Sequence, residues 1–125
     1  MKKLTTLLFT IIASSALLMA QENYPLYKFT SRADAEKVLR VLQSDLKLNA
    51  DQYKAVQELL FNSAKSQQEL YAMEQNKDPK MVEMIVLRNT RHIEANLQNI
   101  LGEDLFKIYN LKKNDIIKKL QEPSK

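Results

Sequence analysis

One glycine, Gly102, stands among the 125 residues of this chain, together with only three prolines. Sandwiches and barrels need a turn roughly every 8 to 12 residues, and those turns draw on glycine for positive φ and on proline for a fixed φ. In addition, no segment alternates apolar and polar residues over a sustained run. The scarcity of both residues therefore predicts an all-α protein and excludes a glycine-rich phosphate-binding loop, while the length predicts one domain.

The residue types that carry most enzyme chemistry are also scarce. The chain has no cysteine, which excludes disulfides and thiolate chemistry, and it has a single histidine, His92. The adjacent carboxylates Glu103 and Asp104 stand at a predicted helix start, where the helix dipole accounts for them. The sequence contains no Ser-His-Asp order and no metal-spaced cluster. We therefore expect a protein that is not an enzyme and that uses no cofactor.

Residues 1–20 have the layout of a secretory signal peptide. Lys2 and Lys3 form a cationic start, an apolar stretch follows, and small residues lead to Ala20. Cleavage after Ala20 leaves 105 residues and, because both lysines are removed, lowers the net charge from +4 to +2. Ser14-Ser15-Ala16 offers an earlier site. The competing interpretation is an uncleaved anchor, but the apolar run is shorter than the ~20 residues of a spanning helix.

After the signal peptide we expect an irregular leader, a helical domain and a short tail, with boundaries at 21–30, 31–122 and 123–125. The leader has no clear period, and three aromatic side chains surround its Pro25: Tyr24, Tyr27 and Phe29. Ser31 and Asp34 have the spacing of a capping box at the start of a first helix. The apolar residues that follow repeat at helical spacing: Ala35, Val38, Leu39, Leu42 and Leu46.

A second helix is predicted to begin at Asn49. Its side chain can accept from a free backbone amide, while Gln52 reaches back to the amide of Asn49. Leu48 and Tyr53 have the spacing of a hydrophobic staple around this cap. The apolar stripe of this helix then comprises Val56, Leu59, Leu60, Ala64 and Leu70, before a polar run that ends near Lys77.

Two further helices are predicted from similar signals. Asp78 can cap a third helix, with Pro79 in its first turn, where a missing amide does no harm. One face of that helix carries Val82, Ile85, Val86, Ile93, Leu97 and Ile100. A fourth helix follows directly, with Gly102 as its cap and with Leu101 and Phe106 as its staple. Its apolar residues are Phe106, Tyr109, Ile116, Ile117 and Leu120.

The second and fourth helix starts repeat one pattern. Leu48-Asn49-Ala50-Asp51-Gln52-Tyr53 aligns with Leu101-Gly102-Glu103-Asp104-Leu105-Phe106, as leucine, cap, acidic residue and aromatic staple. With these two copies the sequence resembles the periplasmic Spy/CpxP family, whose hallmark is a doubled Leu-Thr-x-x-Gln motif. The first copy has asparagine in place of threonine and retains the glutamine, whereas the second retains the leucine alone. The resemblance covers residues 39–113.

The resemblance implies an elongated protein with four helices in antiparallel hairpins, paired as an antiparallel homodimer. It also implies a periplasmic protein that holds unfolded or partly folded proteins without ATP, or that serves as an accessory of envelope-stress regulation. We expect the motif itself to be structural, because it fixes helix starts and tight corners. Its residues are Leu48, Asn49, Gln52, Tyr53, Leu101, Gly102 and Phe106.

Four side chains between residues 73 and 92 have metal-binding chemistry. His92 lies at the flank of an apolar stripe, and the thioethers of Met73, Met81 and Met84 are ligands for soft ions such as copper. Met81 and Met84 straddle their helix face poorly, however, and methionine is a common filler of packed or adaptable surfaces. We therefore assign no metal site and retain a metal-responsive sensor as the weakest of three function classes.

The region from Lys107 to Lys125 holds six lysines against Asp115 and Glu122. A solvated helix face, with cations suited to the negative end of the helix dipole, is the simpler interpretation. A basic rim that attracts acidic proteins or anionic lipid is the alternative. The six lysines are Lys107, Lys112, Lys113, Lys118, Lys119 and Lys125.

Two function classes remain ahead of the sensor. The first is a holdase or envelope-stress accessory, as the resemblance implies. The second is a non-catalytic helical module that binds one defined partner of the cell envelope. Neither class needs nucleic acid or stable membrane insertion after cleavage. The two classes differ in the number of proteins bound: a holdase binds several unrelated unfolded proteins, whereas a dedicated module does not.

Overall fold

The computed structural model describes residues 25–122, and these residues form helices and connections without a strand. The elements are α2 (Arg32–Leu46), α3 (Ala50–Ala72), the 3₁₀ turn η1 (Glu74–Asn76) and α4 (Pro79–Gln121). The prediction of an all-α protein is confirmed. The predicted signal peptide, residues 21–24 of the leader and the tail at 123–125 lie outside the described residues. Within the described part, no helix is long and apolar enough to span a membrane.

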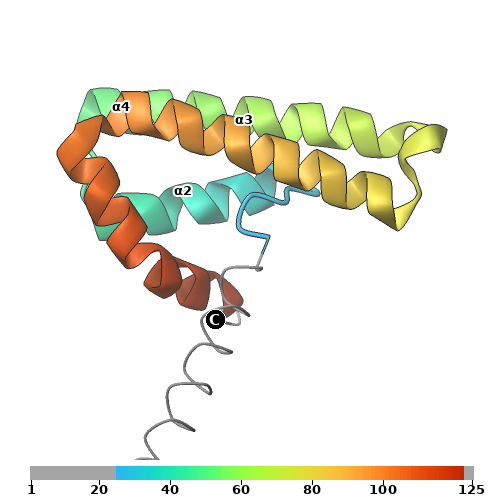
Figure 1. Cartoon of the computed structure of the whole chain (residues 1–125). Helices are drawn as coiled ribbons and strands as arrows, with labels where there is room; N and C mark the ends of the chain where they lie inside the picture. The colour runs from blue at the N-terminus through green and yellow to red at the C-terminus, as the bar shows by residue number, and fades with distance from the viewer. Residues whose placement is uncertain (1–24, 123–125) are drawn as a thin grey trace, which may run out of the picture.

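The three helices pack against one another around a single core. Figure 1 shows α3 and the first part of α4 side by side, with η1 joining them at one end of the molecule. At the opposite end α4 bends, and its last part turns back toward α2, which lies beneath the α3–α4 layer. The described part of the leader lies beneath that layer too, beside the start of α2.

The bend in α4 occurs at Gly102, where a fourth helix was predicted to begin. The element α4 is counted as one of three helices, but Gly102 itself is not helical, so α4 consists of two helical parts, 79–101 and 103–121, joined at a kink. Gly102 has φ 81° and ψ 169°, a region that is almost restricted to glycine. Because a Cβ atom built there meets no atom within 4 Å, the need for glycine is one of backbone conformation and not of space.

The cap of α2 differs from its predicted form. The side chain of Ser31 makes no capping hydrogen bond. The Asp34 carboxylate instead accepts from the backbone amide and the hydroxyl of Thr30, both at 2.8 Å. Thr30 therefore takes the place that the capping box gave to Ser31, because it offers the carboxylate two donors at once.

The cap of α3 confirms its prediction. Asn49 Oδ1 accepts from the backbone amide of Gln52 at 2.8 Å, and Gln52 Oε1 accepts from the amide of Asn49 at 3.1 Å. Leu48 is buried in the core, and Tyr53 packs against that core. Asp78 likewise caps α4 by accepting from the amide of Lys80 at 3.0 Å, with Pro79 in the first turn.

The apolar stripes predicted for the helices face the core, except for Leu70, Val82, Ile85 and Val86. All five stripe residues of α2 are buried, as are the central stripe residues of α3. The buried stripe residues of α3 and α4 are Val56, Leu60, Ala64, Ile85, Ile93, Leu97, Tyr109, Ile116, Ile117 and Leu120.

Replacing Asn49 with alanine is expected to lower the free energy of unfolding by about 1 kcal/mol, because the backbone amide of Gln52 then loses its side-chain acceptor. Urea unfolding followed by circular dichroism measures this loss. Asn62→Ala is the matched control, since Asn62 is exposed in the middle of α3 and alanine is the better helix former there. Equal effects of the two substitutions would contradict the capping role.

Candidate functional site

Part of the irregular leader forms the centre of the core. Tyr27 and Phe29 are completely buried, with their rings edge to face at 6.2 Å. Gln67 of α3, also completely buried, accepts from the amide of Phe29 and donates to the carbonyl of Tyr27, each at 2.8 Å. The sequence predicted the irregular backbone here but not this docking, although three aromatic residues around Pro25 were a signal for it.

A chain of polar contacts, buried at the leader and partly exposed at its far end, continues from the leader to α4. The hydroxyls of Tyr27 and Tyr109 are 2.7 Å apart, Tyr109 donates to Glu94 Oε2 at 2.8 Å, and Lys113 pairs with the same oxygen at 2.8 Å. Burial raises the pKa of both tyrosine hydroxyls far above the usual range. Both tyrosines therefore stay neutral, and the chain fixes the leader against α4.

Several lysines of the basic region bind within the fold. Lys112 donates to the carbonyl of Asp45 at 3.0 Å, near the end of α2, and Lys119 pairs with the Asp45 carboxylate. That hydrogen bond is the main cause of the raised pKa of Lys119. In the other direction, Lys37 of α2 donates to the carbonyl of Leu120 at 2.9 Å. These contacts hold the last part of α4 to α2, so this region serves the architecture in addition to any solvated role.

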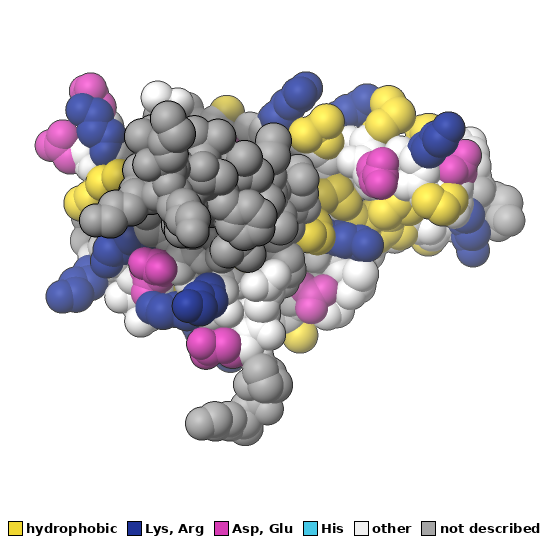
Figure 2. Space-filling model, turned by 60° about the horizontal axis from the view of Figure 1, so that its bottom comes forward, with side chains coloured by type: hydrophobic (Ala, Val, Ile, Leu, Met, Phe, Trp, Pro, Cys, Tyr) yellow, Lys and Arg dark blue, Asp and Glu magenta, His cyan; other side chains and the backbone are white. Residues whose placement is uncertain are grey.

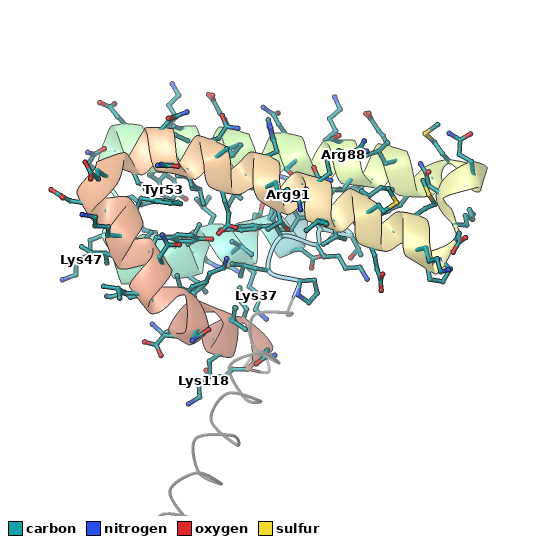
Figure 3. All side chains as sticks on the ribbon, in the orientation of Figure 1. Lys37, Lys47, Tyr53, Arg88, Arg91 and Lys118 are labelled. Atoms are coloured by element: carbon teal, nitrogen blue, oxygen red, sulfur yellow. The ribbon has the colours of Figure 1, made fainter. Side chains whose placement is uncertain are left out.

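The seven motif residues all lie at one end of the molecule. The start of α3 and the bend of α4 are both at the end opposite η1, where Figure 3 labels Tyr53. Leu48 and Leu101 are buried, and Tyr53 and Phe106 pack against the core. The Phe106 ring also stacks on Tyr109 with centroids 5.5 Å apart.

The opposite end of the molecule has a different character. Residues 68–92, which we call the distal arm, comprise the end of α3, η1 and the start of α4. Apart from Glu74, whose side chain is not described, only Asn76 and Ile85 are buried among these residues. Figure 2 shows apolar side chains at the surface of this end, interspersed with basic and acidic ones. The distal arm thus extends beyond the core as two helices packed on each other.

A groove of about 450 Å³ runs along the distal arm, and we call it the methionine groove. It is lined by all three methionines of the described chain, and Figure 3 shows the sulfur atoms gathered near η1. Met73 is 43% exposed, Met81 36% and Met84 53%. The other lining residues are Ser66, Leu70, Gln75, Asn76, Ile85, Arg88, Asn89 and His92.

Two asparagines stiffen the walls of the methionine groove. Asn76 donates to the carbonyl of Leu70 at 2.9 Å, and the same nitrogen lies 3.7 Å from the sulfur of Met73. Asn89 donates to the carbonyl of Ile85 at 2.9 Å. These hydrogen bonds hold the two asparagine side chains in the wall of the groove, and Asn76 also contacts the Met73 side chain.

The structure brings together the four side chains that were singled out for metal chemistry. Although the spacing of Met81 and Met84 argued against a shared face, both line the groove together with Met73 and His92. His92 is exposed, and its ring nitrogen lies 3.5 Å from the side-chain amide of Asn96. Within residues 25–122, no group of three or more His, Cys, Asp or Glu side chains is arranged to hold a metal ion.

Comparison with known proteins gives no match to a family model, to a curated protein or to a solved structure.

Proposed function

We propose that this chain is an exported, ATP-independent holdase or envelope-stress accessory of the Spy/CpxP type, which binds unfolded or partly folded proteins in the periplasm. The proposal includes removal of residues 1–20 and an elongated form in which the chain pairs as an antiparallel homodimer of helical hairpins. Ile108 and Leu111, 41% and 83% exposed on α4, offer apolar surface for such pairing. The resemblance in the sequence supports the class, and the methionine groove supports the activity.

The observation that carries the proposal is the exposure of three thioethers along one groove. Exposed apolar surface beside charged residues is typical of protein-binding sites. Methionine side chains are unbranched and polarizable, so they adapt to many apolar partners, and promiscuous binders use such surfaces. A groove lined in this way suits weak contact with unrelated unfolded segments.

Two cations of the distal arm add an electrostatic component. Arg88 lines the methionine groove, and Figure 3 labels it on α4 one turn before Arg91. Within residues 25–122, neither guanidinium forms an ion pair with an acidic side chain. Both charges are therefore available to acidic segments of a bound protein, and their attraction weakens as salt is added.

The test is suppression of aggregation. Residues 21–125 are mixed at equal molar ratio with either of two unrelated denatured proteins that aggregate on dilution, and light scattering follows each mixture at several salt concentrations. We expect suppression of both, and we expect Met84→Lys to weaken it at least about twofold, because a charge in the groove opposes the burial of apolar surface.

Leu87→Lys is the matched control for this substitution. Leu87 lies on the same helix and is 51% exposed, close to the 53% of Met84, but it does not line the groove. Both variants gain the same charge, so only the groove distinguishes them. Failure to suppress the aggregation of either denatured protein would overturn the holdase proposal and favour the module that binds one envelope partner.

A further inference from the structure

The soft-ligand chemistry of the described chain is concentrated at one place. The whole chain has no cysteine, so thioethers are its softest ligands, and all three thioethers of residues 25–122 line the methionine groove. Each is between one third and just over one half exposed, so all three sulfur-bearing side chains are accessible from solvent. Packing of a core does not require this arrangement, because a filler methionine would be buried.

We propose that Met73, Met81 and Met84 form a site for one soft monovalent cation of the Cu(I) class. Thioethers select such ions, whereas harder divalent cations prefer nitrogen and oxygen ligands. The inference is independent of the proposed holdase function, since it requires only the three sulfur atoms and their placement.

All three methionines lie near η1, at the same end of the groove. Met81 and Met84 are three residues apart in the first turns of α4, so their side chains are neighbours on the helix surface. Met73 follows the end of α3 and reaches the same groove from the facing side. Asn76 contacts the Met73 sulfur at 3.7 Å, which restrains this side chain and leaves a second sulfur lone pair for the ion.

His92 is too far along α4 to complete this site. It stands eight residues after Met84, which places the two residues about 12 Å apart along the helix axis. Bonds from sulfur or nitrogen to a bound metal ion are only about 2 Å long. Arg88 lies between them and lines the groove, and its charge repels a divalent ion more strongly than a monovalent one. The distance of His92 and the charge of Arg88 both favour a site that consists of thioethers alone and does not bind zinc.

Silver ion is the probe, because Ag(I) is a soft monovalent ion with the same filled d¹⁰ shell as Cu(I) and is stable in air. The protein is expressed from the full sequence with ¹³C-labelled methionine methyl groups, and Ag(I) is added during methyl NMR spectroscopy. We expect the signals of Met73, Met81 and Met84 to shift together and to saturate at one ion per chain. Zinc at the same concentration is expected to leave them unchanged.

Substitutions identify the ligands. Met84→Leu conserves side-chain volume, so the fold is retained while one sulfur is lost, and we expect at least about tenfold weaker binding of Ag(I). His92→Gln is expected to bind Ag(I) as the unchanged protein does. Leu87→Met adds a thioether outside the groove, and its methyl signal is expected not to shift at one equivalent.

Three results would overturn the proposed site. The first is that one equivalent of Ag(I) leaves the methyl signals of the groove unchanged. The others are an unchanged affinity of Met84→Leu for Ag(I) and a lost affinity of His92→Gln for Ag(I). Met84→Leu also separates this inference from the proposed function, because leucine keeps the groove apolar. Suppression of aggregation is therefore expected to survive the substitution that weakens binding of Ag(I).

Discussion

Replacing Phe29 with alanine is expected to lower the free energy of unfolding by about 3 to 5 kcal/mol, the range typical of a large aromatic side chain removed from a core. Phe29 is completely buried although it belongs to an irregular segment, and its ring contacts Tyr27 edge to face. Urea unfolding followed by circular dichroism measures the change. The size of this effect reports directly whether the leader is part of the core.

Lys28→Ala is the matched control for Phe29→Ala. Lys28 lies next to Phe29 but is exposed, so its truncation is expected to change the free energy of unfolding by less than about 0.5 kcal/mol. A loss below about 1 kcal/mol for Phe29→Ala would contradict the docked leader, because a truncation in a packed core costs more than that.

The second large effect is expected at Gln67, where leucine should lower the free energy of unfolding by at least about 2 kcal/mol. The substitution leaves the amide of Phe29 and the carbonyl of Tyr27 buried without their partner, and each such group costs about 1 to 3 kcal/mol. The same urea experiment measures the loss. Gln68→Leu is the matched control, because Gln68 is exposed one position along α3.

The two substitutions should also be coupled. Phe29→Ala and Gln67→Leu both release the leader from α3, so the double variant is expected to lose less stability than the sum of the single losses. Strict additivity would mean that the two residues stabilise separate parts of the molecule, and it would contradict the arrangement in which Gln67 holds the leader.

The features that the sequence predicts well are local ones. The reciprocal cap of Asn49 and Gln52 depends on four consecutive residues, and the buried stripe of α2 depends on helical spacing alone. The bend at Gly102 was located correctly as a break in helical conformation. The direction in which the chain continues after this residue was not predicted, because it depends on contacts with α2 that are distant in the sequence.

Features that depend on distant partners were not predicted. Gln67 falls seven residues after Leu60 on the buried stripe of α3, which places a polar side chain toward the core, but its partners in the leader are 38 and 40 residues away. The contact of Asp45 with Lys119 spans 74 residues. A single sequence without its fold contains no signal that pairs such positions.

The methionine groove was predicted in part. Met73, Met81 and Met84 were singled out for their chemistry, yet Met73 belongs to the end of α3 and the others to the start of α4. Only the path of the chain through η1 decides that the three share one surface. The sequence therefore identified the candidate residues, and the fold was needed to assemble them.

The most direct test of the account observes the methionine groove while an unfolded protein binds. Methyl signals of Met73, Met81 and Met84 are recorded in the ¹³C-labelled protein as a denatured protein is added, at a ratio that suppresses aggregation. We predict that these three signals shift or broaden in proportion to suppression. Suppression of aggregation with all three signals unchanged would contradict the account, because the unfolded protein would then bind outside the groove.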